Sequence, residues 1–361
     1  MKTLRQHIRY VKASDGTRLA WAESGDGPVL VKAANWLTHL EYEWESPVWK
    51  HWIQFFSEHC RLVRYDERGC GMSDWQGGGT ALTVDGWTSD LEAVIEAARP
   101  PAPVTLLGIS QGGAACIRYA IRHPERVARM ILYGGYARGA LLRDRPEAAR
   151  AYQAMVDLAR WAWGSDNPTF RQVFTSRFIP GGTVEQLRWF NDLCLKTTSG
   201  EIAAALMEAR AVMDVTNSLP EVRTPTLVLH GRDDAVVPVA EGRLLASGIP
   251  GAEFVELDSR NHVLLDHEPA WQRFREAVLA FLGSDGARGD AGGQRVFDAL
   301  SARERQVLAL MGDGLSNTDI AERLNISEKT VRNHASNLFD KLGVWSRAQA
   351  IVFARDHGFS G

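Results

Sequence analysis

The sequence predicts a large α/β domain followed by a small all-α domain. Three observations support this prediction. Residues 8–282 alternate short apolar runs with longer helical patterns, as in a sheet flanked by helices. Residues 283–293 read GSDGARGDAGG, which is typical of a flexible Gly-rich linker. The roughly 70 residues that follow show four short helical patterns with clear start signals. We therefore expect domains at 1–282 and 294–361.

The composition is that of an ordinary globular protein. Hydrophobic residues make up 45% and charged residues 24% of the 361 residues, which excludes disorder over most of the chain. The formal net charge of −3 argues against a strongly basic nucleic-acid coat protein. The first residues lack the apolar segment of a signal peptide, and no apolar run approaches the ~18 residues that span a bilayer. We expect a cytoplasmic protein without membrane contact.

Cysteine usage excludes a disulfide framework and a zinc site. Cys60, Cys70, Cys116 and Cys194 are scattered, with no CxxC pair and no His/Cys cluster. Such spacing is typical of reduced thiols in a cytosolic protein. We expect neither a metal nor a cofactor.

The elements of the first domain begin with a hairpin. Residues 8–12 and 19–22 flank Ser14-Asp15-Gly16, a hairpin signal. Four later runs are apolar enough to be parallel strands buried on both faces, at 28–32, 103–107, 127–132 and 226–229. Between them lie amphipathic patterns such as 90–98, which predicts a helix. Residues 137–220 interrupt the alternation with Trp-rich amphipathic segments, and we interpret them as a helical insertion.

A candidate nucleophile lies between a predicted strand and a predicted helix. Residues 104–114 read VTLLGISQGGA and contain G-x-S-x-G around Ser110. The small residues Gly108 and Gly112 permit the tight turn that lifts a serine above the sheet. The backbone N–H of Gln111 can then face a developing oxyanion.

A serine nucleophile requires a base and an orienting acid, which follow in the order Asp, His in this architecture. Asp233 and Asp234 come after the strand at 226–229, and Asp258 and His262 come after a further strand pattern at 253–257. Asp233 and Asp258 remain alternatives to Asp234 as the acid. His267, in a loop with acidic neighbours, is an alternative to His262.

These motifs resemble the α/β-hydrolase superfamily. The family signature G-x-x-D-x-x-V-P falls on Gly231, Asp234 and Pro238, and the family histidine falls on His262. Residues 65–73, YDERGCGMS, are similar to the family loop D-x-R-G-x-G-x-S.

The resemblance covers about residues 8–282. It implies an α/β-hydrolase fold, with a mostly parallel sheet and a helical cap at about 137–220. It also implies a catalytic triad of Ser110, Asp234 and His262.

One motif departs from the family pattern. Where the family usually has His-Gly, this chain has Ala34-Asn35. The resemblance assigns the oxyanion hole to the N–H groups of Trp36 and Gln111. Asn tolerates a positive φ better than most residues, so the turn can survive. Because a lost oxyanion donor can cost ~3 kcal/mol of barrier, we expect slow or absent turnover.

Tryptophan occurs twelve times, mostly within residues 21–87 and 161–189. This clustering predicts a ligand pocket with aromatic walls, lined by Asn35, Trp36, His39, Trp161 and Trp163; core packing is the alternative for each tryptophan. The family resemblance implies an uncharged, largely apolar carbonyl ligand such as an ester, lactone or acyl compound.

The C-terminal segment carries three capping signals. Ser301 and Glu304 form a capping box, and Ser316 and Ser327 begin the second and third helices. The third helix leaves polar residues outward near its start: Lys329, Thr330, Arg332, Asn333 and Ser336. Two short helices joined by a tight turn, the second with a polar face, are typical of a helix-turn-helix. A bundle that merely packs on the first domain is the alternative.

Residues 296–358 closely resemble the LuxR-type DNA-binding domain. The resemblance rests on motifs that include Leu300-Ser-x-Arg-Glu304, Gly314-Leu-Ser-Asn317, Thr330-Val331-x-x-His334 and Lys341-Leu-Gly-Val344. It implies an operator-binding homodimer. DNA contacts are expected from the polar face of the third helix and from Lys341.

The combined prediction is a transcriptional regulator whose hydrolase-like domain senses a small ligand. Two alternatives remain: a serine hydrolase with an autoregulatory DNA-binding tail, and a receptor that uses its triad once per ligand.

Overall fold

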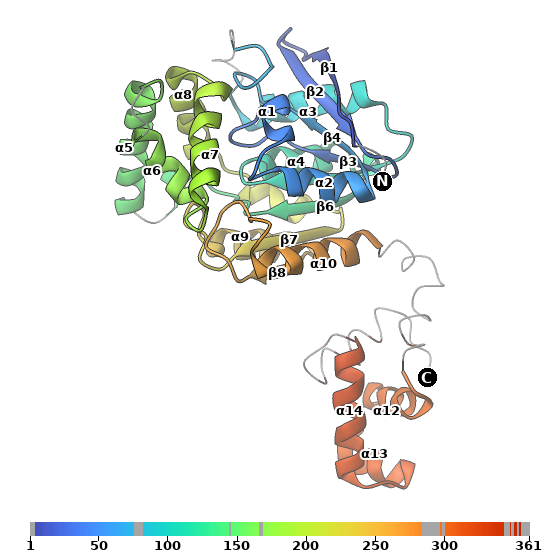
Figure 1. The fold of residues 1–361 in the computed structure, drawn as a ribbon. Helices are drawn as coiled ribbons and strands as arrows, with labels where there is room; N and C mark the ends of the chain where they lie inside the picture. Colours follow the sequence, from blue (N-terminus) through green and yellow to red (C-terminus); the bar gives the residue numbers. More distant parts are fainter. Residues whose placement is uncertain are drawn as a thin grey trace. The chain divides into compact units, whose positions relative to one another are not determined.

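The computed structural model describes residues 4–75, 82–143, 146–165, 169–283, 297, 300–342, 347, 350, 351 and 354. The chain divides into two compact units, Met1–Leu279 and Ala280–Gly361 (Figure 1). Residues 284–293 of the predicted linker lie outside the described residues, as does most of the predicted fourth helix of the C-terminal segment.

An eight-stranded sheet forms the centre of the first unit, in the order β1-β2-β4-β3-β5-β6-β7-β8. Its strands are β1 (His7–Lys12), β2 (Arg18–Ser24), β3 (Val29–Lys32), β4 (Arg61–Tyr65), β5 (Val104–Ile109), β6 (Val127–Tyr133), β7 (Thr226–Gly231) and β8 (Glu253–Leu257). The predicted hairpin is β1 and β2, whose Tyr10 and Ala20 are paired. From β4 to β8 all neighbours are parallel, which confirms the predicted mostly parallel sheet.

Strand β4 escaped the sequence prediction. Its residues read RLVRY, and two arginines interrupt what would otherwise be an apolar run. Arg64 is nevertheless buried, because its Nη1 donates to Glu43 Oε2 at 2.8 Å. Hydropathy alone therefore does not identify a core strand whose charged side chain is buried and paired.

Helices cover both faces of the sheet (Figure 1). On one face α2 (Lys50–His59) and α10 (Pro269–Gly283) meet through Trp52 and Phe274, which also contact Tyr133 of β6. Leu132, the neighbour of Tyr133, belongs instead to the cluster that contains buried residues of α3 (Val84–Ala98), α4 (Gly112–Arg122) and α9 (Val239–Gly248). Successive residues of a strand face opposite sides, so these are the two layers of the sandwich.

The predicted helical insertion comprises α5 (Pro146–Ala162), α6 (Thr169–Phe178), α7 (Val184–Thr197) and α8 (Gly200–Ala211). A single turn, η3 (Ala140–Leu142), precedes them, and η4 (Thr216–Glu221) leads into β7. These helices gather beside the sheet as a cap (Figure 1). A buried ion pair between Arg210 of the cap and Glu67, which follows β4, ties the cap to the sheet.

The second unit contains α12 (Ala302–Gly312), α13 (Asn317–Leu324) and α14 (Glu328–Leu342). Its core includes Val307, Ile320, Val331 and Leu338, which come from all three helices. Asn325, in the left-handed conformation with φ of 51°, ends α13 and sets the turn into α14. Among the described residues of either unit, we find no helix with both the length and the apolar character that a bilayer span requires.

Candidate functional site

Ser110 occupies a strained turn between β5 and α4. Its φ is +53°, a backbone conformation that residues other than glycine rarely adopt. Its N–H donates to Tyr133 O at 2.9 Å. A Cβ on Gly108 would lie 2.6 Å from Gly113 Cα, and a Cβ on Gly112 would lie 2.9 Å from Ala34 O. Only glycine fits both positions, so the turn predicted from G-x-S-x-G depends on them.

His262 and Asp234 form a buried hydrogen-bonded pair. His262 Nδ1 lies 2.7 Å from Asp234 Oδ2, and Asp234 Oδ1 accepts from the N–H groups of Val236 at 2.8 Å and Val237 at 2.9 Å. Burial by itself would raise the pKa of Asp234. His262, together with the Val237 N–H, outweighs burial and holds that pKa below its ordinary value. The carboxylate is therefore ionised and can orient the imidazole.

The other ring nitrogen of His262 is open. Nε2 is buried and has no hydrogen-bond partner among the described residues, so Ser110 Oγ and Nε2 are not hydrogen-bonded in this structure. Catalytic hydrogen bonds often tighten only when a ligand binds. The cap fixes the loop that carries this histidine, because the N–H of His262 donates to Phe178 O at 2.8 Å.

Neither alternative acid nor the alternative histidine joins this pair. Asp258 makes an ion pair with Arg232 at 3.3 Å, and Asp233 is exposed. His267 is half exposed, and its Nδ1 lies 3.4 Å from Oδ1 of the neighbouring Asp266.

Asn35 holds its neighbours through side-chain hydrogen bonds, and its backbone does not adopt a positive φ. Positive φ occurs at three described non-glycine residues, and Asn35 is not one of them. Its Oδ1 accepts from Lys32 Nζ, and its Nδ2 donates to Trp36 O at 3.0 Å. Burial lowers the pKa of Lys32 to about 8. The prediction that Asn35 lines the ligand pocket is wrong, since the residue is buried and does not belong to the cavity wall.

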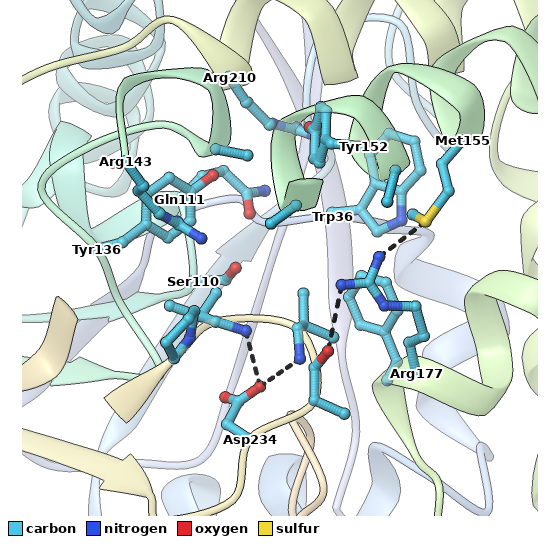
Figure 2. A pocket seen from close by; sticks show the side chains of 18 of the residues that line it. Trp36, Ser110, Gln111, Tyr136, Arg143, Tyr152, Met155, Arg177, Arg210 and Asp234 are labelled. Atoms are coloured by element: carbon cyan, nitrogen blue, oxygen red, sulfur yellow. Dashed lines mark hydrogen bonds between the residues drawn. The ribbon is translucent and has the colours of Figure 1, made fainter. Parts of the chain in front are cut away.

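A cavity of about 850 Å³ opens onto Ser110 (Figure 2). Its wall from the sheet side includes Trp36, Ser110, Gln111 and Asp234. The cap contributes aromatic, thioether and cationic side chains, among them Arg143, Tyr152, Met155, Phe174, Arg177, Phe178, Met207 and Arg210. Such a volume is typical of sites that enclose a small organic ligand.

In the second unit, the first two turns of α14 present a polar face. Lys329, Arg332, Asn333 and Ser336 are exposed, whereas Val331 is fully buried. Arg332 makes a partly exposed contact of 3.2 Å with Glu328. This face has the composition that contacts phosphates and base edges in a major groove.

Two of the predicted DNA contacts have other partners. Thr330 is half-buried, and its Oγ1 lies 2.8 Å from Ser327 Oγ, within the cap of α14. Lys341 Nζ lies 2.7 Å from Oε2 of Glu304, a buried carboxylate that also accepts from Ser301 N. We therefore interpret Lys341 as a residue that stabilises this unit, because moving it to a phosphate would leave the carboxylate without its cation.

Comparison with known proteins accounts for both units. Residues 52–269 match the family described as serine aminopeptidase, S33 (Hydrolase_4), and residues 298–354 match the bacterial regulatory proteins of the luxR family (GerE). The chain belongs to the α/β-hydrolase superfamily and carries a LuxR-type DNA-binding domain.

Individual relatives agree with this assignment. The chain is 28% identical over 280 residues to 3-oxoadipate enol-lactonase 2 of Acinetobacter baylyi, covering 76% of this chain and 97% of that protein. It is 34% identical over 149 residues to the DNA-binding transcriptional activator DevR/DosR of Mycobacterium tuberculosis, covering 40% and 64%. The solved enol-lactonase of Burkholderia xenovorans superposes with a TM-score of 0.60 at 27% identity, covering 76% and 100%.

Within this α/β hydrolase, three predicted pocket residues lie elsewhere. Trp161 is 83% exposed, so the prediction that it walls the pocket is wrong. His39 is also absent from the cavity wall, since it caps α1 (Leu40–Trp44) by accepting from Tyr42 N. Trp163 lies behind the wall: it is buried and packs edge-on against Trp36, with ring centroids 5.6 Å apart.

Sequence reasoning missed the cap arginines and the glycine beside the histidine. The prediction for residues 137–220 depends on their tryptophans alone, so it gives Arg143, Arg177 and Arg210 no place in the cavity wall. Gly134, which directly follows β6, has a φ of +56°, and a Cβ there would lie 3.1 Å from His262 Cε1. Its position directly after a buried strand was the available signal.

Proposed function

We propose that this protein is a ligand-responsive transcriptional regulator. The α/β-hydrolase domain binds a small carbonyl compound in the cavity at Ser110, and the LuxR-type domain binds operator DNA. An ester, a lactone or an acyl compound would place its carbonyl carbon at Ser110. We infer that the protein acts in the bacterial cytoplasm, because its proposed target is DNA.

The observation that carries this proposal is the cavity of about 850 Å³ onto which Ser110 opens, in a chain that also has a DNA-binding domain. The enol-lactonases among the relatives have names that refer to lactones. A regulator needs coupling between its two sites: the ligand and the operator must change each other's affinity by the same factor.

The test is a titration of operator DNA with and without ligand. Operator fragments are first selected from a random duplex library with the full chain, and ligands are found by thermal shift in a panel of esters and lactones. We expect a saturating ligand to change operator affinity by about 5-fold or more at fixed salt. Identical operator affinity in both conditions would show two unrelated activities on one chain.

A second candidate function is a serine hydrolase whose DNA-binding domain regulates its own expression. The hydrogen-bonded pair of His262 and Asp234 favours this candidate. Product analysis on the ligands found above separates the two functions. Many turnovers per protein molecule indicate an enzyme, one turnover indicates a single-use receptor, and none indicates a sensor.

We further propose a homodimer with two independently folding domains, at 1–282 and 294–361. Limited proteolysis should cut first within the Gly-rich segment 283–293, and ultracentrifugation of the full chain should give a dimer mass. A monomer that binds the operator with full affinity would contradict the dimer.

A further inference from the structure

Three arginines from separate parts of the cap line the cavity beside Ser110. Arg143 follows η3, Arg177 lies on α6 and Arg210 lies on α8 (Figure 2). A cavity suited to a neutral apolar ester does not require cations, because burying a charge is costly unless the charge is paired. The partners of these arginines therefore indicate what the cavity accepts.

Among the residues that the structure describes, a close carboxylate partner is found for one of the three. Arg210 makes a buried ion pair with Glu67. Arg143 is 3.9 Å from Glu241, whose same oxygen accepts a hydrogen bond from Arg138 at 2.9 Å.

Arg177 has only neutral acceptors within the described part of the chain. Its Nη1 lies 2.7 Å from Met155 Sδ, and its Nη2 donates to Ala235 O at 3.2 Å (Figure 2). Among the described residues, no carboxylate lies within 4 Å of its guanidinium. Within the part of the chain that the structure describes, Arg177 is therefore a partly buried cation without a close counterion.

Neither Asp233 nor Asp234, the acids of the cavity wall, makes a direct ion pair with Arg177. Asp234 is already bound to His262 and to two backbone N–H groups, and Asp233 is exposed at the rim. Burial lowers the pKa of Arg143 and of Arg177, which means that the protein solvates these cations poorly. An anionic ligand group would supply the missing partner.

The three arginines also act on one side chain. Burial raises the pKa of Tyr152, on α5, and the charges of Arg210, Arg143 and Arg177 each lower it, while Asp234 acts on Arg177. The rest of the wall is largely apolar, with Trp36, Phe174, Phe178, Met207 and Val236. The cavity thus combines a nucleophile, an apolar wall and one uncompensated cationic region.

We propose that the ligand carries a carboxylate, which pairs with Arg177 and Arg143 while the ligand carbonyl lies at Ser110 and its apolar body contacts the aromatic wall. This inference rests on the proposed function and replaces the uncharged ligand predicted from the sequence. A monoanion fits better than a phosphate dianion, because one guanidinium lacks a partner and a second is only half paired.

The test measures binding of matched acids and esters to the full chain by calorimetry. The probes are 3-benzoylpropionate, 4-benzoylbutyrate and 5-benzoylvalerate, each compared with its own methyl ester. Their ketone cannot be hydrolysed, and the titrations use Ser110→Ala so that the methyl esters are not turned over by a serine nucleophile. We expect at least one acid to bind roughly tenfold more tightly than its ester, as hydrogen bonds to charged groups predict.

Variants locate the effect. Arg177→Gln should lower the affinity for that acid roughly tenfold and leave the affinity for the ester unchanged, while Arg177→Lys should keep part of the preference. The matched control is Arg232→Gln, since Arg232 also borders the cavity but is exposed and pairs with Glu256 and Asp258. Unchanged ester binding also shows that each variant is folded.

Two outcomes would overturn the inference: no acid binds more tightly than its ester, or Arg232→Gln removes the preference as fully as Arg177→Gln. The proposed function fails independently. An acid preference without any change in operator affinity would support the carboxylate site and contradict the sensor function. A neutral ester that alters operator affinity, with no acid preference, would support the sensor function and contradict the carboxylate site.

Discussion

The predicted triad of the hydrolase domain and the polar face of α14 present their side chains in opposite ways. Ser110, Asp234 and His262 are at most 9% exposed, and the last two are bonded to each other. Lys329 and Arg332 are exposed to solvent. Acid–base chemistry gains from fixed partners in a low dielectric. Phosphate binding requires accessible cations that displace counterions.

This difference has a consequence for substitutions. In the buried site, each group depends on its neighbours, so a change near the reacting atoms should act through geometry. On the polar face of α14, each side chain should act locally and leave folding intact. The largest expected effects therefore belong to the hydrolase domain.

The first prediction concerns the triad. Ser110 should react with a fluorophosphonate probe, and Ser110→Ala should abolish that labelling. His262→Ala should slow labelling by about a thousandfold, because the general base is lost. Labelling kinetics followed by intact mass spectrometry provide the measurement. If the wild-type protein does not react with the probe, Ser110 lines a binding site but does not act as a nucleophile.

The second prediction tests whether the position of the His262 ring controls the reactivity of Ser110. Gly134→Ala should slow labelling of Ser110 roughly tenfold, because the new methyl group would displace His262. Gly251→Ala is the matched control: its φ is also positive, at +70°, but no atom lies within 4 Å of its Cβ position. Both variants should lose about 1 kcal/mol of stability from backbone strain. Equal labelling rates in the two would remove the role assigned to Gly134.

The third prediction separates contact from support in the DNA-binding domain. Arg332→Ala should weaken operator binding by about 1–3 kcal/mol without a change in thermal stability. Lys341→Ala should lower the melting temperature of this domain, because Glu304 would lose its cation. The loss should stay below about 1 kcal/mol, since the Lys341 side chain is 39% exposed. Gel-shift and calorimetric scans measure the two effects. A stable Lys341→Ala domain with weak operator binding would restore Lys341 as a DNA contact.

The fourth prediction uses a buried carboxyl that directly follows β4. Burial raises the pKa of Asp66 to about 7, among Lys32, Glu43 and Arg64. A pKa raised by folding stabilises the protein below the unfolded value and loses that contribution as pH rises through the folded value.

Asp66→Asn cannot titrate, so its unfolding free energy relative to wild type should rise between about pH 4 and pH 7. We expect a change of roughly 1 kcal/mol or more, from urea unfolding followed by tryptophan fluorescence at both ends of the range. Parallel pH curves for the two proteins would contradict the raised pKa.

The smallest effect is expected at Trp161. Trp161→Gln should leave ligand affinity and labelling of Ser110 unchanged, because the ring is 83% exposed and does not line the cavity. Trp163→Leu is the informative partner, since it would remove the support behind Trp36. If Trp161→Gln weakened ligand binding by itself, the buried site would extend beyond the described cavity wall.

Sequence reasoning succeeded where function is encoded over short distances. The turn at Ser110 depends on glycines two residues away, and the caps at Ser301 and Ser316 bond to residues three positions ahead. It failed at β4, where Arg64 is buried by a pair formed across the fold. It also placed Trp161 and His39 in the pocket, because residue type does not show which way a helix faces.

Sequence patterns alone predict the two domain types, the mostly parallel sheet, the candidate triad and the polar face of α14. Each follows from periodicity, from fixed spacing or from a local backbone requirement. The tertiary structure decided which cap side chains enter the cavity and whether their charges are paired. Arg177 differs from Arg210 not in sequence context but in what lies opposite: neutral acceptors in one case and Glu67 in the other. Partners distant in the chain are set by how helices pack on the sheet, and packing is a property of the whole domain.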